Sequence, residues 1–216
     1  MHAVRPLPAY LVKRYHGWRA TDYTENHAWY ERLAEEGQRP RTMLITCCDS
    51  RIQWSSIFGA ETGEFFIHRN IANLVPPYQP DGALHGTSAA VEYAVTSLHV
   101  SNIVVLGHSN CGGVKGCHDM CQGHAPELED ESSFVGRWMD LLRPKYALVE
   151  DIADEAERLE ALEKQCVLAS LENLLTFPFV AQGVTEDRLA LHGLWHHIAK
   201  GGLEVYDPTR DGFAPL

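Results

Sequence analysis

Residues 103–113 have the sequence Ile103-Val104-Val105-Leu106-Gly107-His108-Ser109-Asn110-Cys111-Gly112-Gly113, an unbroken apolar run that leads into a glycine-containing turn. Four consecutive apolar residues are typical of a strand that is covered on both faces, as in a parallel sheet. The turn after such a strand lies where the carboxyl ends of parallel strands usually bind ligands. The stretch therefore predicts an α/β fold with His108 and Cys111 at its functional site.

The rest of the chain supplies the other elements of such a fold. Short apolar runs at residues 42–47 and 64–68 predict two further strands. Residues 85–99 have the length and helical spacing of a crossover helix between parallel strands. A long amphipathic helix is expected over residues 152–176, with glutamates and lysines on its exposed face and Pro178 ending it. With one or two strands in residues 187–206, we expect a mainly parallel sheet of four to five strands flanked by helices.

The residues before the first strand form a separate segment. Residues 1–40 are helical in pattern and rich in tyrosine and tryptophan, which indicates an arm that covers another surface. We therefore expect an N-terminal helical arm over residues 1–40 and an α/β domain over residues 41–216.

Composition narrows the function. The formal net charge is −11 and the sequence pI is near 5.5, so nucleic acid and anionic membranes are poor partners. No apolar stretch approaches the roughly 20 residues that span a bilayer, and the N-terminus lacks a signal-peptide pattern. We expect a cytoplasmic protein that binds neither membrane nor nucleic acid. Its six cysteines then favour metal binding, catalysis or buried thiols over disulfides.

A second motif, Cys47-Cys48-Asp49-Ser50-Arg51, follows the first predicted strand. Side chains alternate along a strand, so Cys47 and Asp49 should point to one side and Cys48 to the other. Arg51 is placed to pair with the Asp49 carboxylate and lower its pKa. A buried cysteine beside a surface ion pair is the simpler alternative for this motif alone.

The two motifs together provide three metal ligands. Cys47, His108 and Cys111 offer two thiolates and one imidazole, and three protein ligands on zinc leave the fourth position free for water, as in catalytic sites. A glycine-rich phosphate loop is the alternative for residues 107–112, but the lysine and Ser/Thr that such a loop needs after Gly112 are missing.

Three motifs resemble one family. Cys47-x-Asp49-x-Arg51, His68-Arg69-Asn70-x-Ala72-Asn73 and Gly107-His108-Ser109-x-Cys111-Gly112-Gly113 are similar to the β-class carbonic anhydrases, and residues 73–78 resemble the plant-type branch, in a bacterial or similar protein. The resemblance implies one Zn²⁺ per chain, held by Cys47, His108 and Cys111. It implies Asp49 and Arg51 as catalytic residues, with Asp49 as a possible fourth ligand in a closed state.

The resemblance also implies a substrate cleft at a dimer interface and self-association as a dimer or dimer-based oligomer, with the N-terminal arm embracing the partner. The cleft residues it implies are Gln38, Phe66, Ile71, Tyr93 and Gly112. For Phe66 and Tyr93, plain core aromatics remain the alternative. Leu44 stands where one bacterial branch has a tryptophan that helps bind inhibitory bicarbonate, and Arg69 alone cannot make that pocket, so we expect no such regulation.

The implied activity is a carbonic anhydrase (carbonate dehydratase, a lyase): reversible hydration of CO₂ to bicarbonate and a proton by a zinc-bound hydroxide, with activity rising towards alkaline pH. Two alternatives stay open: a carbonyl sulfide or carbon disulfide hydrolase on the same scaffold, and a non-enzymatic zinc- or thiol-binding protein. Cys117 and Cys121, with neighbouring histidines, could hold a second metal. Their spacing is not that of a usual zinc finger, and a solvent-exposed loop is the expected reading.

Overall fold

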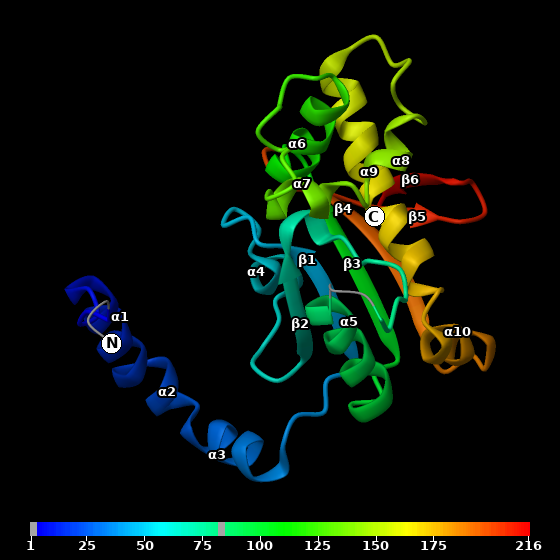
Figure 1. The fold of residues 1–216 in the computed structure, drawn as a ribbon. Coiled ribbons are helices and arrows are strands. Elements are labelled where there is room, and N and C mark those ends of the chain that lie inside the picture. The colour runs from blue at the N-terminus through cyan, green and yellow to red at the C-terminus, as the bar shows by residue number, and fades with distance from the viewer. Residues whose placement is uncertain (1–3, 82–84) are drawn as a thin grey trace. The chain divides into compact units, whose positions relative to one another are not determined.

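The computed structural model describes residues 4–81 and 85–216, and the chain divides into two compact units, Met1–Arg39 and Pro40–Leu216. Residues 1–3 of the expected arm lie outside the described residues. The first unit consists of helices α1 (Ala9–Ala20), α2 (Asp22–Glu25) and α3 (His27–Glu36), shown in blue in Figure 1. Its rings contact one another, as Tyr23 stacks on Tyr30 at 5.4 Å between centroids. The role of this arm in self-association stays a prediction.

The second unit is built on a mainly parallel sheet, which confirms the predicted fold class. Its described strands are β1 (Thr42–Cys47), β2 (Phe65–Asn70), β3 (Asn102–His108), β4 (Ala190–His197), β5 (Gly202–Asp207) and β6 (Gly212–Pro215). They lie in the order β2-β1-β3-β4-β5-β6 (Figure 1). The first four are parallel, whereas β5 and β6 are added antiparallel at one edge.

Helices and helical turns connect and cover these strands. Those in the second unit are α4 (Trp54–Phe58), the 3₁₀ turn η1 (Ile71–Asn73), α5 (His85–Glu92), the π-helical turn η2 (Tyr93–Ser97), α6 (Gly112–Cys121), α7 (Phe134–Met139), α8 (Arg143–Tyr146), α9 (Glu155–Leu174) and α10 (Pro178–Thr185). In Figure 1, α5 and α10 lie beside the lower part of the sheet, and α6 and α7 lie beyond the upper ends of β1 and β3. The predicted crossover helix is thus confirmed as α5, continued by η2.

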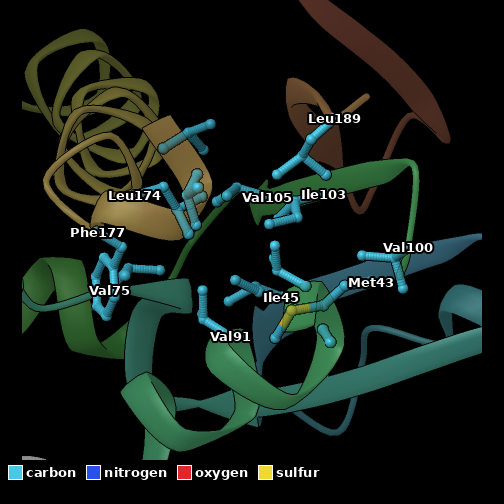
Figure 2. Packing of buried hydrophobic residues seen from close by; sticks show 14 residues of the cluster. Met43, Ile45, Val75, Val91, Val100, Ile103, Val105, Leu174, Phe177 and Leu189 are labelled. Carbon is cyan, nitrogen blue, oxygen red and sulfur yellow. The ribbon is translucent and has the colours of Figure 1, made fainter. Parts of the chain in front are cut away.

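The core has a layer on each face of the sheet because side chains alternate along β1 and β3. Ile45 and Val105 point into one layer with Leu174 of α9, as Figure 2 shows. Leu44 and Leu106 point to the other face, where α4 packs. These residues are fully buried, so the central strands are covered on both sides and their carboxyl ends are held in a fixed register.

Three local differences from the sequence prediction have physical causes. The sheet has a sixth strand because β6, only four residues long, pairs with β5 and is too short to show a pattern. Helix α9 begins at Glu155, because the Asp154 side chain accepts a hydrogen bond from the Glu157 N–H at 2.9 Å. Pro178 is the first residue of α10 rather than the stop of α9, since proline fits the first helical position.

Helices α9 and α10 follow one another closely and are the longest apolar stretch to consider as a membrane span. No single helix in the described ranges is both long and apolar enough to cross a membrane, and α9 with α10 reach that length and composition only across a bend of 90°.

Candidate metal centre

The three predicted metal ligands lie at the carboxyl ends of two neighbouring parallel strands. Cys47 ends β1, His108 ends β3, and Cys111 directly precedes α6. Because β1 and β3 pair in parallel, with Thr46 opposite Leu106, their ends meet at one edge of the sheet. The two Sγ atoms and a His108 ring nitrogen lie within 4.8 Å of one another, with 4.0 Å between the sulfurs. The structure therefore brings these three side chains together.

The hydrogen bonding of His108 leaves its Nε2 atom able to bind a cation. Its Nδ1 lies 3.0 Å from the Ser109 carbonyl oxygen, an acceptor, so Nδ1 carries the proton and donates it. Its Nε2 then has a free lone pair, and this atom is buried with no hydrogen-bond partner among the described residues. A buried acceptor without a partner is costly unless something binds it. His108 therefore has the arrangement of a metal-binding histidine: the hydrogen bond from Nδ1 fixes the tautomer, and Nε2 is left to bind the metal.

The thiols of Cys47 and Cys111 together carry one negative charge. Hydrogen bonding from the Cys111 thiol, together with the nearby His108, lowers the pKa of Cys47 to about 4 despite burial. The hydrogen bond to Cys47, with burial, raises the pKa of Cys111. One anion is thus stable beside the other thiol, and a bound dication would let both ionise. The donor set fits Zn²⁺, and the role of these residues as its ligands stays a prediction.

The strand alternation separates Cys47 from Cys48. Cys47 is 5% exposed and faces the other two ligands, whereas Cys48 is exposed and lines a different cavity. Its backbone N–H continues the pairing with β2 by donating to the Asn70 carbonyl at 2.7 Å. The geometry therefore favours Cys47 of the two adjacent thiols.

Asp49 and Arg51 form a two-pronged ion pair at the rim of the ligand group. Arg51 Nε donates to Asp49 Oδ1 at 2.9 Å, and Nη2 donates to Oδ2 at 2.6 Å. Hydrogen bonds from Arg51 hold the pKa of Asp49 well below its usual range. Arg51 also donates to the Asn110 carbonyl at 2.9 Å, which ties the first motif to the second. Asp49 Oδ2 lies 4.0 Å from His108 Nε2, so the carboxylate stands beside the metal-binding atoms while Arg51 engages it.

Arg69 on β2 holds the loop that carries Cys47 and Asp49, a role that the sequence analysis did not assign. Its Nε donates to the Cys47 carbonyl at 2.9 Å, and its Nη2 donates to the carbonyls of Asp49 and Ile52 at 2.8 and 3.1 Å. Arg69 pairs in register with Thr46 on the neighbouring strand. Strand register is set by the tertiary structure, so no local pattern around Arg69 predicted these contacts.

Helix α9 positions another segment near the site. Cys166 Sγ donates to the Ala72 carbonyl at 3.0 Å, and Ser170 Oγ donates to the Asn73 carbonyl at 3.0 Å. Ala72 and Asn73 have φ values of 63° and 51°, an unusual pair for residues other than glycine. In this conformation the Ala72 N–H points at Cys47 Sγ, 3.4 Å away. The helix therefore stabilises a strained turn that donates to a candidate metal ligand.

Glu163 was placed wrongly in the sequence analysis. The pattern of α9 put its glutamates on the exposed face, yet Glu163 is 4% exposed. Burial raises its pKa to about 7, against the lowering effect of its hydrogen bonds from Cys111 and Trp195. Its position one turn before the buried Cys166 was the only sequence signal.

Four of the five predicted cleft residues lie in the second unit, and they are not gathered around one of its described cavities. Ile71 lines an apolar cavity of about 770 Å³ with Cys48, Phe134, Trp138 and their neighbours. Phe66 packs against Tyr93, with 5.8 Å between the ring centroids, and Tyr93 is half exposed. Gly112 borders a separate, smaller hollow, and Gln38 is exposed in the first unit. A cleft shared between two chains would divide its lining in this way, and the five residues stay a prediction.

The expectation that Cys117 and Cys121 lie in an exposed loop is wrong. Both belong to α6, because the turn after His108 leads into a helix that continues to Cys121. Cys117 is buried, and burial raises the pKa of its thiol to about 12. Within the described parts of the chain, Cys47, His108 and Cys111 are the one group of three or more side chains arranged to hold a metal ion.

Comparisons with known proteins agree on one family. A model of the carbonic anhydrase family matches residues 42–203. β-Carbonic anhydrase 3 of Arabidopsis thaliana is 37% identical over 194 residues, which are 88% of this chain and 73% of the plant protein. The structure of the β-carbonic anhydrase CcaA is similar at a TM-score of 0.88 and 28% identity, over 96% of this chain and 91% of that one.

A tetrameric β-carbonic anhydrase from Sordaria macrospora is similar at a TM-score of 0.75 and 31% identity, over 91% of this chain and 95% of that one. The chain thus belongs to the carbonic anhydrases and, within them, to the β class. The resemblance inferred from the sequence motifs is confirmed, and the non-enzymatic alternative is set aside.

Proposed function

We propose that this chain hydrates CO₂ reversibly to bicarbonate and a proton, with one zinc ion held by Cys47, His108 and Cys111. One observation carries the proposal: the buried Nε2 of His108 has no hydrogen-bond partner among the described residues, and a His108 ring nitrogen lies within 4.8 Å of the Sγ atoms of Cys47 and Cys111. Membership in the β-class carbonic anhydrases supports CO₂ as the substrate.

The chemistry divides between the metal and the chain. Bound by these ligands, zinc would act as a Lewis acid that makes water nucleophilic near neutral pH. Asp49 supplies a carboxylate that is ionised across the physiological range, because Arg51 lowers its pKa. From the rim of the site its free lone pairs accept a hydrogen bond from the attacking water and fix the direction of attack. Arg51 keeps both Asp49 oxygens oriented, and its bond to Asn110 holds the two motifs in one geometry.

The apolar cavity that Cys48 and Ile71 border suits an uncharged substrate, and these residues adjoin Cys47 and Ala72 in the chain. Its lining is mostly apolar, with Ile71, Phe134 and Trp138 among its side chains. Trp138 Nε1 donates to the Ile71 carbonyl at 2.8 Å, which fixes the indole in the wall. Because CO₂ is small, linear and apolar, such a wall suits it, and Arg137 is the charged residue in the lining. We further propose that a second copy of the chain completes this cleft; the Sordaria macrospora relative is described as tetrameric.

Stopped-flow CO₂ hydration by protein of measured zinc content tests the proposal. We expect one zinc per chain and a zinc-dependent rate that rises from roughly pH 6.5 to 9. Zinc at that ratio without CO₂ hydration at any pH would refute the substrate while preserving the metal site. Carbonyl sulfide and carbon disulfide, assayed in parallel, would then show whether the same site is a hydrolase.

A further inference from the structure

Glu163 is a buried acid that the proposed reaction does not use. It lies in the middle of α9 and is 4% exposed. Its two hydrogen-bond donors among the described residues, the Cys111 N–H and the Trp195 indole, are uncharged. The neighbouring Lys164 instead pairs with Glu160 and Glu204 at 2.7 and 2.9 Å. Burying a carboxyl group without a cation is unfavourable, so its retention needs a reason in what it contacts.

Both carboxyl oxygens of Glu163 accept hydrogen bonds from N–H groups near the metal centre. Oε1 accepts from the Cys111 backbone N–H at 3.0 Å, and Oε2 accepts from the Trp195 indole N–H at 3.2 Å. Trp195 is 1% exposed and lies on β4, beside the strand that ends at His108. Glu163 therefore connects a rigid strand to a candidate metal ligand.

Cys111 depends on such an external contact. It precedes the first residue of α6 with φ −69° and ψ 117°, and its side chain makes no capping hydrogen bond. The preceding Asn110 is in the left-handed region at φ 57°, so the backbone changes direction immediately before the ligand. The contact with Glu163 fixes the peptide plane at this bend, and with it the direction in which Sγ leaves the backbone.

We propose that Glu163 is a positioning residue that holds Cys111 in the geometry required for metal binding, with Trp195 anchoring its second oxygen. This inference rests on the proposed zinc site but not on the substrate. Glu163 acts through the peptide N–H of Cys111, which lies in the backbone behind the metal-binding Sγ. Loss of residues that orient metal ligands typically weakens metal binding about 10- to 100-fold.

Glu163→Gln is the decisive variant because glutamine has nearly the same shape as glutamate but only one side-chain oxygen. That oxygen cannot accept from both the Cys111 N–H and the Trp195 N–H. Zinc release to a competing chelator should become about 10- to 100-fold faster than in wild-type protein. The cobalt-substituted variant should show a weaker thiolate-to-cobalt charge-transfer band and shifted visible bands. For CO₂ hydration, kcat should fall with little change in KM, because Glu163 does not touch the substrate.

Two further variants separate positioning from other effects. Glu155→Gln removes a negative charge from an exposed position at the start of α9 and should leave zinc release and the cobalt spectrum unchanged. Trp195→Phe should speed zinc release several-fold, because the second oxygen loses its anchor. The double variant Glu163→Gln/Trp195→Phe should release zinc more slowly than Glu163→Gln, since the glutamine oxygen can then face Cys111 without opposing the indole N–H.

Three results would overturn the inference. They are a wild-type cobalt spectrum and release rate in Glu163→Gln, an equal effect of Glu155→Gln, and a double variant that releases zinc as fast as Glu163→Gln. Should Glu163→Gln not fold, an unchanged release rate in Trp195→Phe overturns it instead. Wild-type protein that holds zinc but does not hydrate CO₂ would refute the proposed function only. The cobalt spectra and release rates would still decide the role of Glu163.

Discussion

Gly107 offers a stringent test of how tightly β3 packs beside the metal centre. The residue directly precedes His108, and a Cβ added to it would lie 2.6 Å from Cγ2 of Val167 on α9. Favourable carbon–carbon contacts need about 3.5 Å or more, so the shortfall is about 1 Å. Val167 is fully buried, and its branched side chain has one preferred rotamer in a helix, so it cannot turn away cheaply.

We therefore predict that Gly107→Ala lowers the free energy of unfolding by about 2 kcal/mol, within the roughly 1–3 kcal/mol typical of overpacking. The strand must shift to relieve the contact, and His108 moves with it, so zinc content should fall as well. Urea unfolding at fixed protein concentration measures the first quantity, and elemental analysis of the purified protein measures the second. Gly202→Ala is the matched control, because a Cβ there meets nothing within 4 Å.

A compensating change identifies the cause. Val167→Ala removes Cγ2, and alone it should cost about 2 kcal/mol for lost burial and the cavity it leaves. In the double variant the new methyl group occupies part of that cavity. The loss of unfolding free energy should therefore be about 1–2 kcal/mol smaller than the sum of the losses in the two single variants. Strictly additive losses, or an unchanged unfolding free energy in Gly107→Ala, would refute the steric reasoning.

Three further predictions concern Asp49 and α9. Asp49→Asn should lower kcat for CO₂ hydration by roughly 100-fold or more while zinc content is kept; a fully active variant would remove Asp49 from the mechanism. Because Arg51 depresses the folded-state pKa of Asp49, the pair stabilises the fold above the unfolded-state pKa of about 4, and this stabilisation is lost as the pH falls through the folded-state pKa. Unfolding free energies between roughly pH 6 and 2.5 should thus fall more steeply in wild-type protein than in Asp49→Asn, whereas parallel curves would contradict the pairing. Ser170→Ala leaves the buried Val75 N–H without its acceptor at 3.1 Å and should lower the unfolding free energy by about 1–3 kcal/mol, whereas the exposed Thr185→Ala should change it by less than about 0.5 kcal/mol.

Local sequence was sufficient for the central strands and their turns. The apolar run at residues 103–106 needs burial on both faces, and only a sheet covered on both sides provides it. Period-two alternation separated Cys47 from Cys48 and placed Asp49 beside the ligand group, as the structure shows. These features depend on residues within a few positions of one another, so the spacing of residues along the sequence predicts them.

The supporting contacts were not available from such patterns. Arg69 bonds to carbonyls 17 to 22 residues earlier, and Glu163 bonds to Cys111 across 52 residues. Both side chains are charged, so their residue type alone would predict that they are exposed to solvent. Burial and hydrogen bonding at these positions depend on which elements pack together, so helical periodicity placed Glu163 on the wrong face of α9.

The sequence alone therefore determined the class of fold, the three candidate ligands and the Asp49–Arg51 pair, because strand period, turn position and ligand type are local properties. Tertiary structure decided which polar groups hold that site in shape, that Cys117 and Cys121 lie in a helix, and that Ile71 and Gly112 border different cavities. Those outcomes follow from contacts between elements far apart in sequence, where the packing of whole helices and strands fixes the partner of each side chain.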